Sequence, residues 1–305
     1  MKKRIMAVVL AGLTIASLTG CGGQSSSGAS SAASSASSES TAADTAQADA
    51  SAADAGTEAA AETDSSSDAA DSDVAYIKNK GTMIVGITDF APMDYKNDDG
   101  DWIGFDADLA KKVGEDLGVD VKFTEIDWDN KQLELDNKSI DVVWNGMTLT
   151  DEVKKSMECT EPYLNNAQVV VLPKDKADKY PDTDSMKDLN FAVEAGSAGE
   201  AAAKDLGFNY TSLSAQSDTL MEVAAGTSDA SIIDFLMAGA MIGEGTDYPN
   251  LIHTLELTTE EYVVGARKGS DLASYLNDEF AKFTKDGTME SIAKQYGVQD
   301  ALVQQ

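Results

Sequence analysis

The chain has 305 residues, of which 53 are acidic and 23 are basic, so its formal net charge is −30 at pH 7. This excess of negative charge excludes nucleic acid and anionic membrane surfaces as partners, because both are bound through clustered cations. The sequence has two cysteines, Cys21 and Cys159.

Residues 1–20 are predicted to be a secretory signal peptide. Lys2, Lys3 and Arg4 form a basic segment, residues 6–18 are mostly apolar, and small residues then lead to Cys21. The apolar segment is too short for an ordinary membrane-spanning helix. The ending Leu-Thr-Gly-Cys resembles the lipobox of bacterial lipoproteins, and this resemblance implies that Cys21 is lipidated and becomes the new N-terminus.

Residues 21–73 are predicted to be a lipidated cysteine followed by a disordered tether. From residue 22 to 73 the sequence contains Ser, Ala, Gly, Thr and Asp in abundance and no Lys, Arg or aromatic residue. Such a segment cannot bury enough apolar surface to offset the entropy lost on ordering. As a flexible chain it would span roughly 40 Å. With Cys21 lipidated, Cys159 has no partner for an intrachain disulfide.

From residue 82 onward, strand-like and helix-like segments alternate. Strands are expected at 82–88, 120–126 and 140–144, and helices at 105–117 and 131–137. A second series has strands at 167–172, 190–193, 210–213 and 231–234, with helices at 196–206, 218–225 and 235–242. Strands at 251–257 and 262–266 and one or two helices within 271–296 close the chain. This alternation predicts α/β units with mostly parallel sheets, and two such units suggest two lobes with a cleft between them.

The segment WNGMTLTDEVKK (144–155) is the first candidate for a ligand site. We expect the strand to end at Asn145-Gly146, a short turn to include Thr148, and a helix to start at Thr150. Such a turn directs backbone N–H groups at one point and suits an anion. Val153, however, occupies the first helical turn, where a carboxylate site would have a fixed positive charge.

Other candidates follow from the rule that ligands bind at the carboxyl ends of the strands. Phe90 and Trp128 are aromatic residues in polar loops and suit the body of a small ligand. Ser197 and Ala198 open a helix whose free N–H groups can accept an anionic group. Asp234 ends a buried strand, where a carboxylate needs a partner such as a ligand cation.

Two further motifs are weaker evidence for a functional site. The segment 97–101 lacks the ligand pattern of a calcium-binding loop, and we expect a hairpin turn between Tyr95 and Trp102. Ser197, Asp234 and His253 occur in the chain order of a hydrolase triad, but order without geometry is weak evidence. No cofactor and no metal site is expected.

Together, the segments APMDYKNDDGDWIGFDADLAKKV, IDVVWNGMTLTDEVKKSMECTEPY, VEAGSAGE, SDASIIDF and DGTMESIAKQYG resemble the extracellular solute-binding proteins (family 3 type) of polar-amino-acid ABC transporters. The resemblance covers residues 76–300. It implies a two-lobed periplasmic-binding-protein-like fold of type II, with lobe 1 at 74–170 and 264–305 and lobe 2 at 171–263. Two crossing strands, near 168–173 and 262–266, would join the lobes.

By the same resemblance, Phe90 and Trp128 would sandwich the ligand side chain. Asn145, Gly146 and Thr148 would contact its amino and carboxylate groups, Ser197 and Ala198 its carboxylate, and Asp234 its ammonium group. Similar proteins have an arginine at the position of Val153. Lys154 is not expected to replace it, because neighbouring helix residues point about 100° apart, and Arg267 is expected near the end of a crossing strand, away from the matching pocket.

The resemblance implies a monomeric, non-enzymatic lipoprotein on the outer face of the bacterial membrane that delivers a small solute to an ABC permease. The ligand is expected to be an amino acid, or a compound lacking an α-carboxylate. A dehydratase-like enzyme or a sensory module with the same fold is the alternative.

Overall fold

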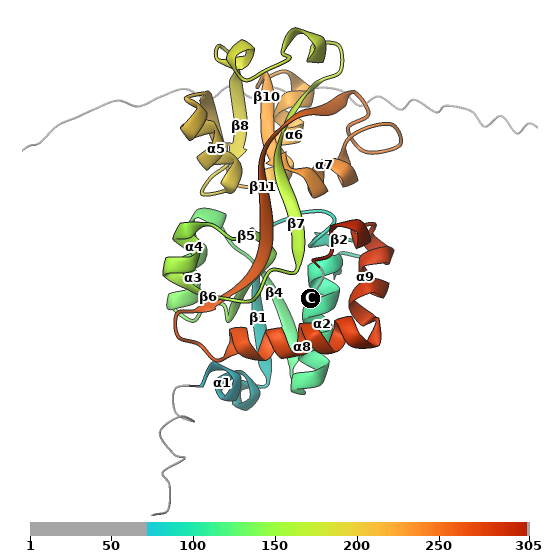
Figure 1. Cartoon of the computed structure of the whole chain (residues 1–305). Coiled ribbons are helices and arrows are strands. Elements are labelled where there is room, and N and C mark those ends of the chain that lie inside the picture. The colour runs from blue at the N-terminus through green and yellow to red at the C-terminus, as the bar shows by residue number, and fades with distance from the viewer. Residues whose placement is uncertain (1–71, 304–305) are drawn as a thin grey trace, which may run out of the picture. The chain divides into compact units, whose positions relative to one another are not determined.

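A computed structural model describes residues 72–303 as a mixed α/β fold (Figure 1). Nine strands form one sheet in the order β4-β1-β5-β11-β7-β10-β8-β9, and β6 pairs with β11 beside this path. The predicted signal peptide, Cys21 and nearly all of the predicted tether lie outside the described residues. No helix in residues 72–303 is both long enough and apolar enough to cross a membrane.

The first part of the sheet comes from β1 (Thr82–Ile87), β4 (Asp120–Glu125) and β5 (Val142–Thr148), which run parallel to one another. Its helices are α1 (Asp73–Lys80), α2 (Phe105–Leu117), α3 (Lys131–Asp136) and α4 (Asp151–Ser156). A short 3₁₀ helix, η1 (Trp128–Asn130), precedes α3, and β6 (Met157–Cys159) follows α4. The hairpin predicted at residues 97–101 is confirmed, because β2 (Tyr95–Lys96) pairs antiparallel with β3 (Trp102–Ile103).

The second part contains β8 (Asn190–Glu194), β9 (Asn209–Leu213) and β10 (Ala230–Asp234), which are again parallel. Helices α5 (Ala198–Leu206), α6 (Gln216–Ala225) and α7 (Phe235–Met241) pack against these strands. Helices α8 (Leu272–Asp286) and α9 (Thr288–Tyr296) return to the first part, where α9 contacts α2 and α8 contacts α1. The expected α/β class with mostly parallel strands and flanking helices is confirmed.

Two long antiparallel strands connect the parts. The chain runs from the first part to the second through β7 (Leu164–Pro173) and returns through β11 (Leu251–Arg267), and the two strands pair along most of their length (Figure 1). Every antiparallel pairing of the large sheet involves one of them. β11 pairs with β5 from residue 262 onward, and β7 pairs with β10 from residue 168 onward. Between these points, the pair formed by residues 165–167 of β7 and 259–261 of β11 has no other strand beside it.

Alternating side chains divide the core between the two faces of the sheet. Val169 and Val171 belong to one large apolar cluster, whereas Val170 and Leu172 belong to a second cluster on the opposite face. A third cluster contains Val143 and packs under α3 and α4. This period of two is the pattern of strands covered on both faces, which accounts for their continuous apolar sequences.

Three sequence predictions were wrong. Residues 145–148 continue β5 and do not form a turn, and the two strands expected at 251–257 and 262–266 are one strand. Helix α1 was not predicted. It begins at Asp73 with Ser72 as its N-cap, so these two residues belong to the folded body and not to a disordered tether.

Candidate functional site

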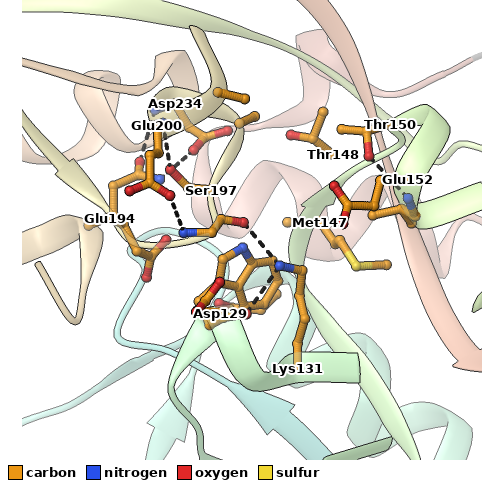
Figure 2. Close-up of a pocket in the computed structure, with 18 of the residues that line it drawn as sticks. Asp129, Lys131, Met147, Thr148, Thr150, Glu152, Glu194, Ser197, Glu200 and Asp234 are labelled. Atoms are coloured by element: carbon orange, nitrogen blue, oxygen red, sulfur yellow. Dashed lines mark hydrogen bonds between the residues drawn. The ribbon is translucent and has the colours of Figure 1, made fainter. Parts of the chain in front are cut away.

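A cavity of about 560 Å³ lies where the carboxyl ends of β1 and β5 face those of β8 and β10 (Figure 2). The structure brings all eight predicted site residues to its wall: Phe90, Trp128, Asn145, Gly146, Thr148, Ser197, Ala198 and Asp234. Their roles in binding a ligand stay predictions. The location follows the rule for α/β sheets, in which strand ends and the loops after them form the binding crevice.

The two aromatic residues form an apolar part of this wall. Phe90, in the loop after β1, is 4% exposed, and Trp128, the first residue of η1, is 8% exposed. The ring of Phe90 packs edge-on against Tyr262, with 6.4 Å between the ring centroids. Both aromatic side chains are therefore held by packing, which suits a preformed surface for the body of a ligand.

Asn145 has a structural role in the cavity wall. Its Oδ1 accepts hydrogen bonds from the backbone N–H of Thr88 (3.0 Å) and from the Thr88 hydroxyl (2.8 Å). Its Nδ2 donates to the Thr88 carbonyl and to Asp94 Oδ2 (2.8 Å). Both amide hydrogens are therefore occupied, and the side chain ties β5 to β1.

The N–H of Gly146 points away from the cavity, so it cannot bind an anionic ligand group as the predicted turn would. It donates to Oδ2 of the buried Asp106 at 2.7 Å, and the hydroxyl of Tyr163 donates to both oxygens of the same carboxylate. Burial raises the pKa of Asp106 to about 6, and hydrogen bonds to the charged form limit the rise. Gly146 has φ of +54°, and a Cβ there would lie 2.7 Å from the Phe90 ring, so the position requires glycine.

Asp234 lies at the centre of a buried hydrogen-bond network. Its Oδ1 accepts from Tyr262 (2.6 Å), Gln168 (3.1 Å) and Asn166, and its Oδ2 accepts from Gln216 (2.6 Å). Burial first, and the nearby Glu260 carboxylate second, raise the pKa of Asp234 to about 7.

Glu260 joins this network to β5. Its Oε1 accepts from the Thr148 hydroxyl at 2.9 Å and also from Asn166 and Gln168. The hydroxyl of Thr148, which was predicted to contact the ligand, thus donates a hydrogen bond to a carboxylate of β11.

Ser197 is the N-cap of α5, as the sequence predicts. Its hydroxyl accepts from the N–H of Glu200 at 3.1 Å, and Glu200 Oε2 accepts from Gly196 N–H at 2.8 Å. The backbone N–H groups of Ala198 and Gly199, in the first turn, have no partner inside the helix. Of these two residues Ala198 lines the cavity, so its N–H is the anion receptor that this part of the wall offers.

The position expected to hold an arginine is apolar. Val153 is 7% exposed and packs in the cluster that contains Trp128, Met147 and Met157. Lys154 is absent from the cavity wall. Arg267 is buried elsewhere, with Nε and Nη2 donating to Asp73 and Nη1 donating to backbone carbonyls. The structure therefore excludes compensation by Arg267, and it places Lys154 outside the site.

Sequence reasoning missed several charged residues of the wall, among them Lys131 and Glu194 (Figure 2). Lys131 Nζ donates to the carbonyls of Trp128 (3.1 Å) and Gly196 (3.0 Å) and so joins α3 to the loop before α5. Burial lowers the pKa of Lys131, and the Glu194 carboxylate opposes that effect. Glu194 is the last residue of β8, so the strand-end rule already pointed to it.

The hydrolase triad is excluded by geometry. The Ser197 hydroxyl caps α5, Asp234 is bound by neutral donors, and the ring of His253 packs edge-on against Phe235 at 5.4 Å between centroids. No hydrogen bond joins the three residues within the described chain. Residues 72–303 also contain no cluster of three or more His, Cys, Asp or Glu side chains that could hold a metal ion.

Comparisons with known proteins agree with a ligand-binding cavity. The L-cystine-binding protein TcyJ of Escherichia coli (strain K12) is 28% identical over 229 residues, which are 72% of this chain and 84% of that protein. The arginine-binding extracellular protein ArtP of Bacillus subtilis (strain 168) is 27% identical over 71% of this chain and 86% of its own length.

Among solved structures, the ancestral amino acid-binding protein AncCDT-1, a precursor of cyclohexadienyl dehydratase, matches with a TM-score of 0.67 and 30% identity. The match covers 74% of this chain and 99% of that one. These three proteins are named for binding, which supports a binding protein over an enzyme. The family model described as bacterial extracellular solute-binding proteins, family 3, matches residues 83–299. The chain belongs to this family.

Proposed function

We propose that this protein captures an amino acid or a close derivative in the cavity and delivers it to an ABC permease. The observation that carries the proposal is the pairing of two opposite receptors in one cavity. Asp234 can accept an ammonium group, and the N–H of Ala198, in the first turn of α5, can accept a carboxylate. Phe90 and Trp128 supply the apolar surface beside them. That combination suits a zwitterion with a side chain.

The same proposal covers transport, in which the tether anchors the protein and the two lobes close over the ligand. Lipidated Cys21 and the tether up to residue 71 would hold the folded body at the outer face of the membrane as a monomer. Lobe 1 (74–170 and 264–305) and lobe 2 (171–263) would close over the ligand by bending where only β7 and β11 connect them, near residues 165–167. That point lies a few residues before the first crossing predicted from the sequence.

One observation favours a second candidate, a ligand without an α-carboxylate. The apolar Val153 leaves the first turn of α4 without the guanidinium that would grip a carboxylate with two hydrogen bonds. We prefer the amino acid, because the N-terminus of α5 offers a separate anion receptor and Lys131 places a cation nearby.

Isothermal titration calorimetry of the mature protein against a panel of amino acids tests the proposal. At least one amino acid should bind, and Asp234→Asn should weaken that binding by about 10- to 100-fold, because a charge-assisted hydrogen bond is lost. Thr183→Ala, in a surface segment away from the cavity, is the control and should bind like the parent protein. Absence of heat with every amino acid in the panel would refute the proposal.

A further inference from the structure

Glu194 is a buried carboxyl group in the cavity wall that lacks a full set of partners. It is 4% exposed, and its Oε1 has no hydrogen-bond partner among the described residues. It lies at the carboxyl end of β8 and lines the same cavity as Asp234 (Figure 2). A buried polar atom without a partner is costly, so this one calls for an explanation.

The other acidic residues of the wall do not share this condition. Asp234 accepts hydrogen bonds from four neutral side chains, and Glu200 accepts from Gly196 N–H and the Ser212 hydroxyl. Asp129, Asp151 and Glu152 are exposed, so water solvates their charges. Glu194 is therefore the buried acid of this wall whose charge has the least compensation.

The nearby lysine does not supply that compensation in full. Lys131 Nζ donates to the carbonyls of Trp128 and Gly196, and no ion pair within 4.0 Å joins it to Glu194 in residues 72–303. Lys204, the other lysine of the wall, is exposed. Six acidic and two basic side chains line the cavity, so an incoming cation meets a favourable potential.

We propose that Glu194 determines the specificity of the cavity by binding a second cationic group of the ligand, and that the ligand is a diamino or guanidino acid. This inference rests on the proposed function, in which Asp234 binds the α-ammonium group. A side-chain ammonium or guanidinium would give the Glu194 carboxylate the charged hydrogen-bond donor that the protein itself does not provide.

The positions of the two acids allow one small molecule to reach both. β8 and β10 are adjacent parallel strands, and neighbouring strands lie about 4.8 Å apart. Glu194 and Asp234 end these strands on the same edge of the sheet. Burial first, and the Asp234 carboxylate second, raise the pKa of Glu194 to about 8, as expected for an acid whose counter-charge is missing.

Calorimetry with matched ligand pairs tests the inference on the unmodified mature protein. Arginine and citrulline have nearly the same shape, but only arginine is cationic in its side chain, and lysine and norleucine form a second such pair. At least one cationic member should bind about 10- to 100-fold more tightly than its neutral counterpart. Equal affinities within both pairs would overturn the inference.

A charge-neutralising variant provides the second test. Glu194→Gln keeps the size of the side chain and removes its charge, so it should reduce the preference for the cationic member about 10-fold or more. Glu244→Gln makes the same change at an exposed position outside the cavity wall and should leave the preference intact. If amino acids bind but Glu194→Gln keeps the full preference, the inference fails and the proposed function stands. If no amino acid binds at all, the proposed function fails and the inference fails with it.

Discussion

Restoring an arginine at position 153 probes how the cavity holds a carboxylate. Val153 is buried in the wall beside Trp128, Met147 and Met157, and it occupies the first turn of α4. In Val153→Arg, the aliphatic part of the new side chain can cover the same apolar surface, while the guanidinium extends into the cavity of about 560 Å³. A ligand carboxylate could then accept two hydrogen bonds from this guanidinium.

The size of the gain follows from two opposing effects. Each hydrogen bond to a charged group contributes about 1.5–3 kcal/mol, and part of this is offset by desolvating and ordering the arginine. A net gain of about 1–3 kcal/mol corresponds to roughly 5- to 150-fold tighter binding. The substitution should also reduce folding stability by about 1–2 kcal/mol, because the well-packed valine contacts are lost.

The assay is calorimetry with the amino acid that the parent protein binds best, together with urea unfolding to confirm that the variant folds. Lys154→Arg is the matched control, because the neighbouring side chain lies outside the cavity wall. It should leave the dissociation constant within twofold. If Val153→Arg folds but binds no more tightly than the parent, then the carboxylate does not face α4 and our assignment of this position is wrong.

Three further predictions concern the framework of the site. Arg267→Met should reduce the free energy of unfolding by about 3–5 kcal/mol in urea titrations, because Asp73 is left with an unpaired buried charge; a change in ligand affinity without loss of stability would contradict this structural role. Gly146→Ala should cost about 2–4 kcal/mol, because φ of +54° disfavours alanine and its Cβ would lie 2.7 Å from Phe90; a loss below about 0.5 kcal/mol would contradict it. Folding raises the pKa of Glu194 from 4.5 to about 8, so its protonated form stabilises the fold most below about pH 4.5, and this contribution declines up to about pH 8. Glu194→Gln should flatten the decline of ligand-free stability over that pH range, and an unchanged pH profile would show that Glu194 does not cause it.

The order of strands and helices could be predicted from the sequence, because each buried strand is a continuous apolar segment and the helix ends carry clear signals. Gly118 shows this, since it ends α2 in the left-handed conformation, as expected of a glycine after the last turn. The signal for the helix start at Thr150 is equally local, because the Thr150 hydroxyl accepts a hydrogen bond from the N–H of Val153, three residues later.

The course of β5 could not be predicted in the same way. Asn145-Gly146 has the composition of a turn, yet these residues continue the strand because distant groups hold them. Asp106 accepts the N–H of Gly146, and Asp94 accepts a hydrogen bond from the Asn145 amide. Such contacts, 40 and 51 residues apart in the chain, leave no pattern in a local sequence window.

The candidate site was predicted in its location and only partly in its chemistry. All eight predicted residues reach one cavity, because strand ends and helix starts converge there. The direction in which each polar group points depends on its hydrogen-bond partner. Thr148 illustrates this, because its hydroxyl donates to Glu260 of β11. Lys131 and Glu194 were missed because a charged residue in a helix or at a strand end is usually a solvated one.

A crystal structure of the mature protein with its tightest-binding amino acid tests the central claim most directly. The account predicts the ligand in the cavity between Phe90 and Trp128, with its ammonium group within hydrogen-bonding distance of Asp234 and its carboxylate at the N–H of Ala198. A ligand bound elsewhere, or bound in the cavity without contact to Asp234, would contradict the account.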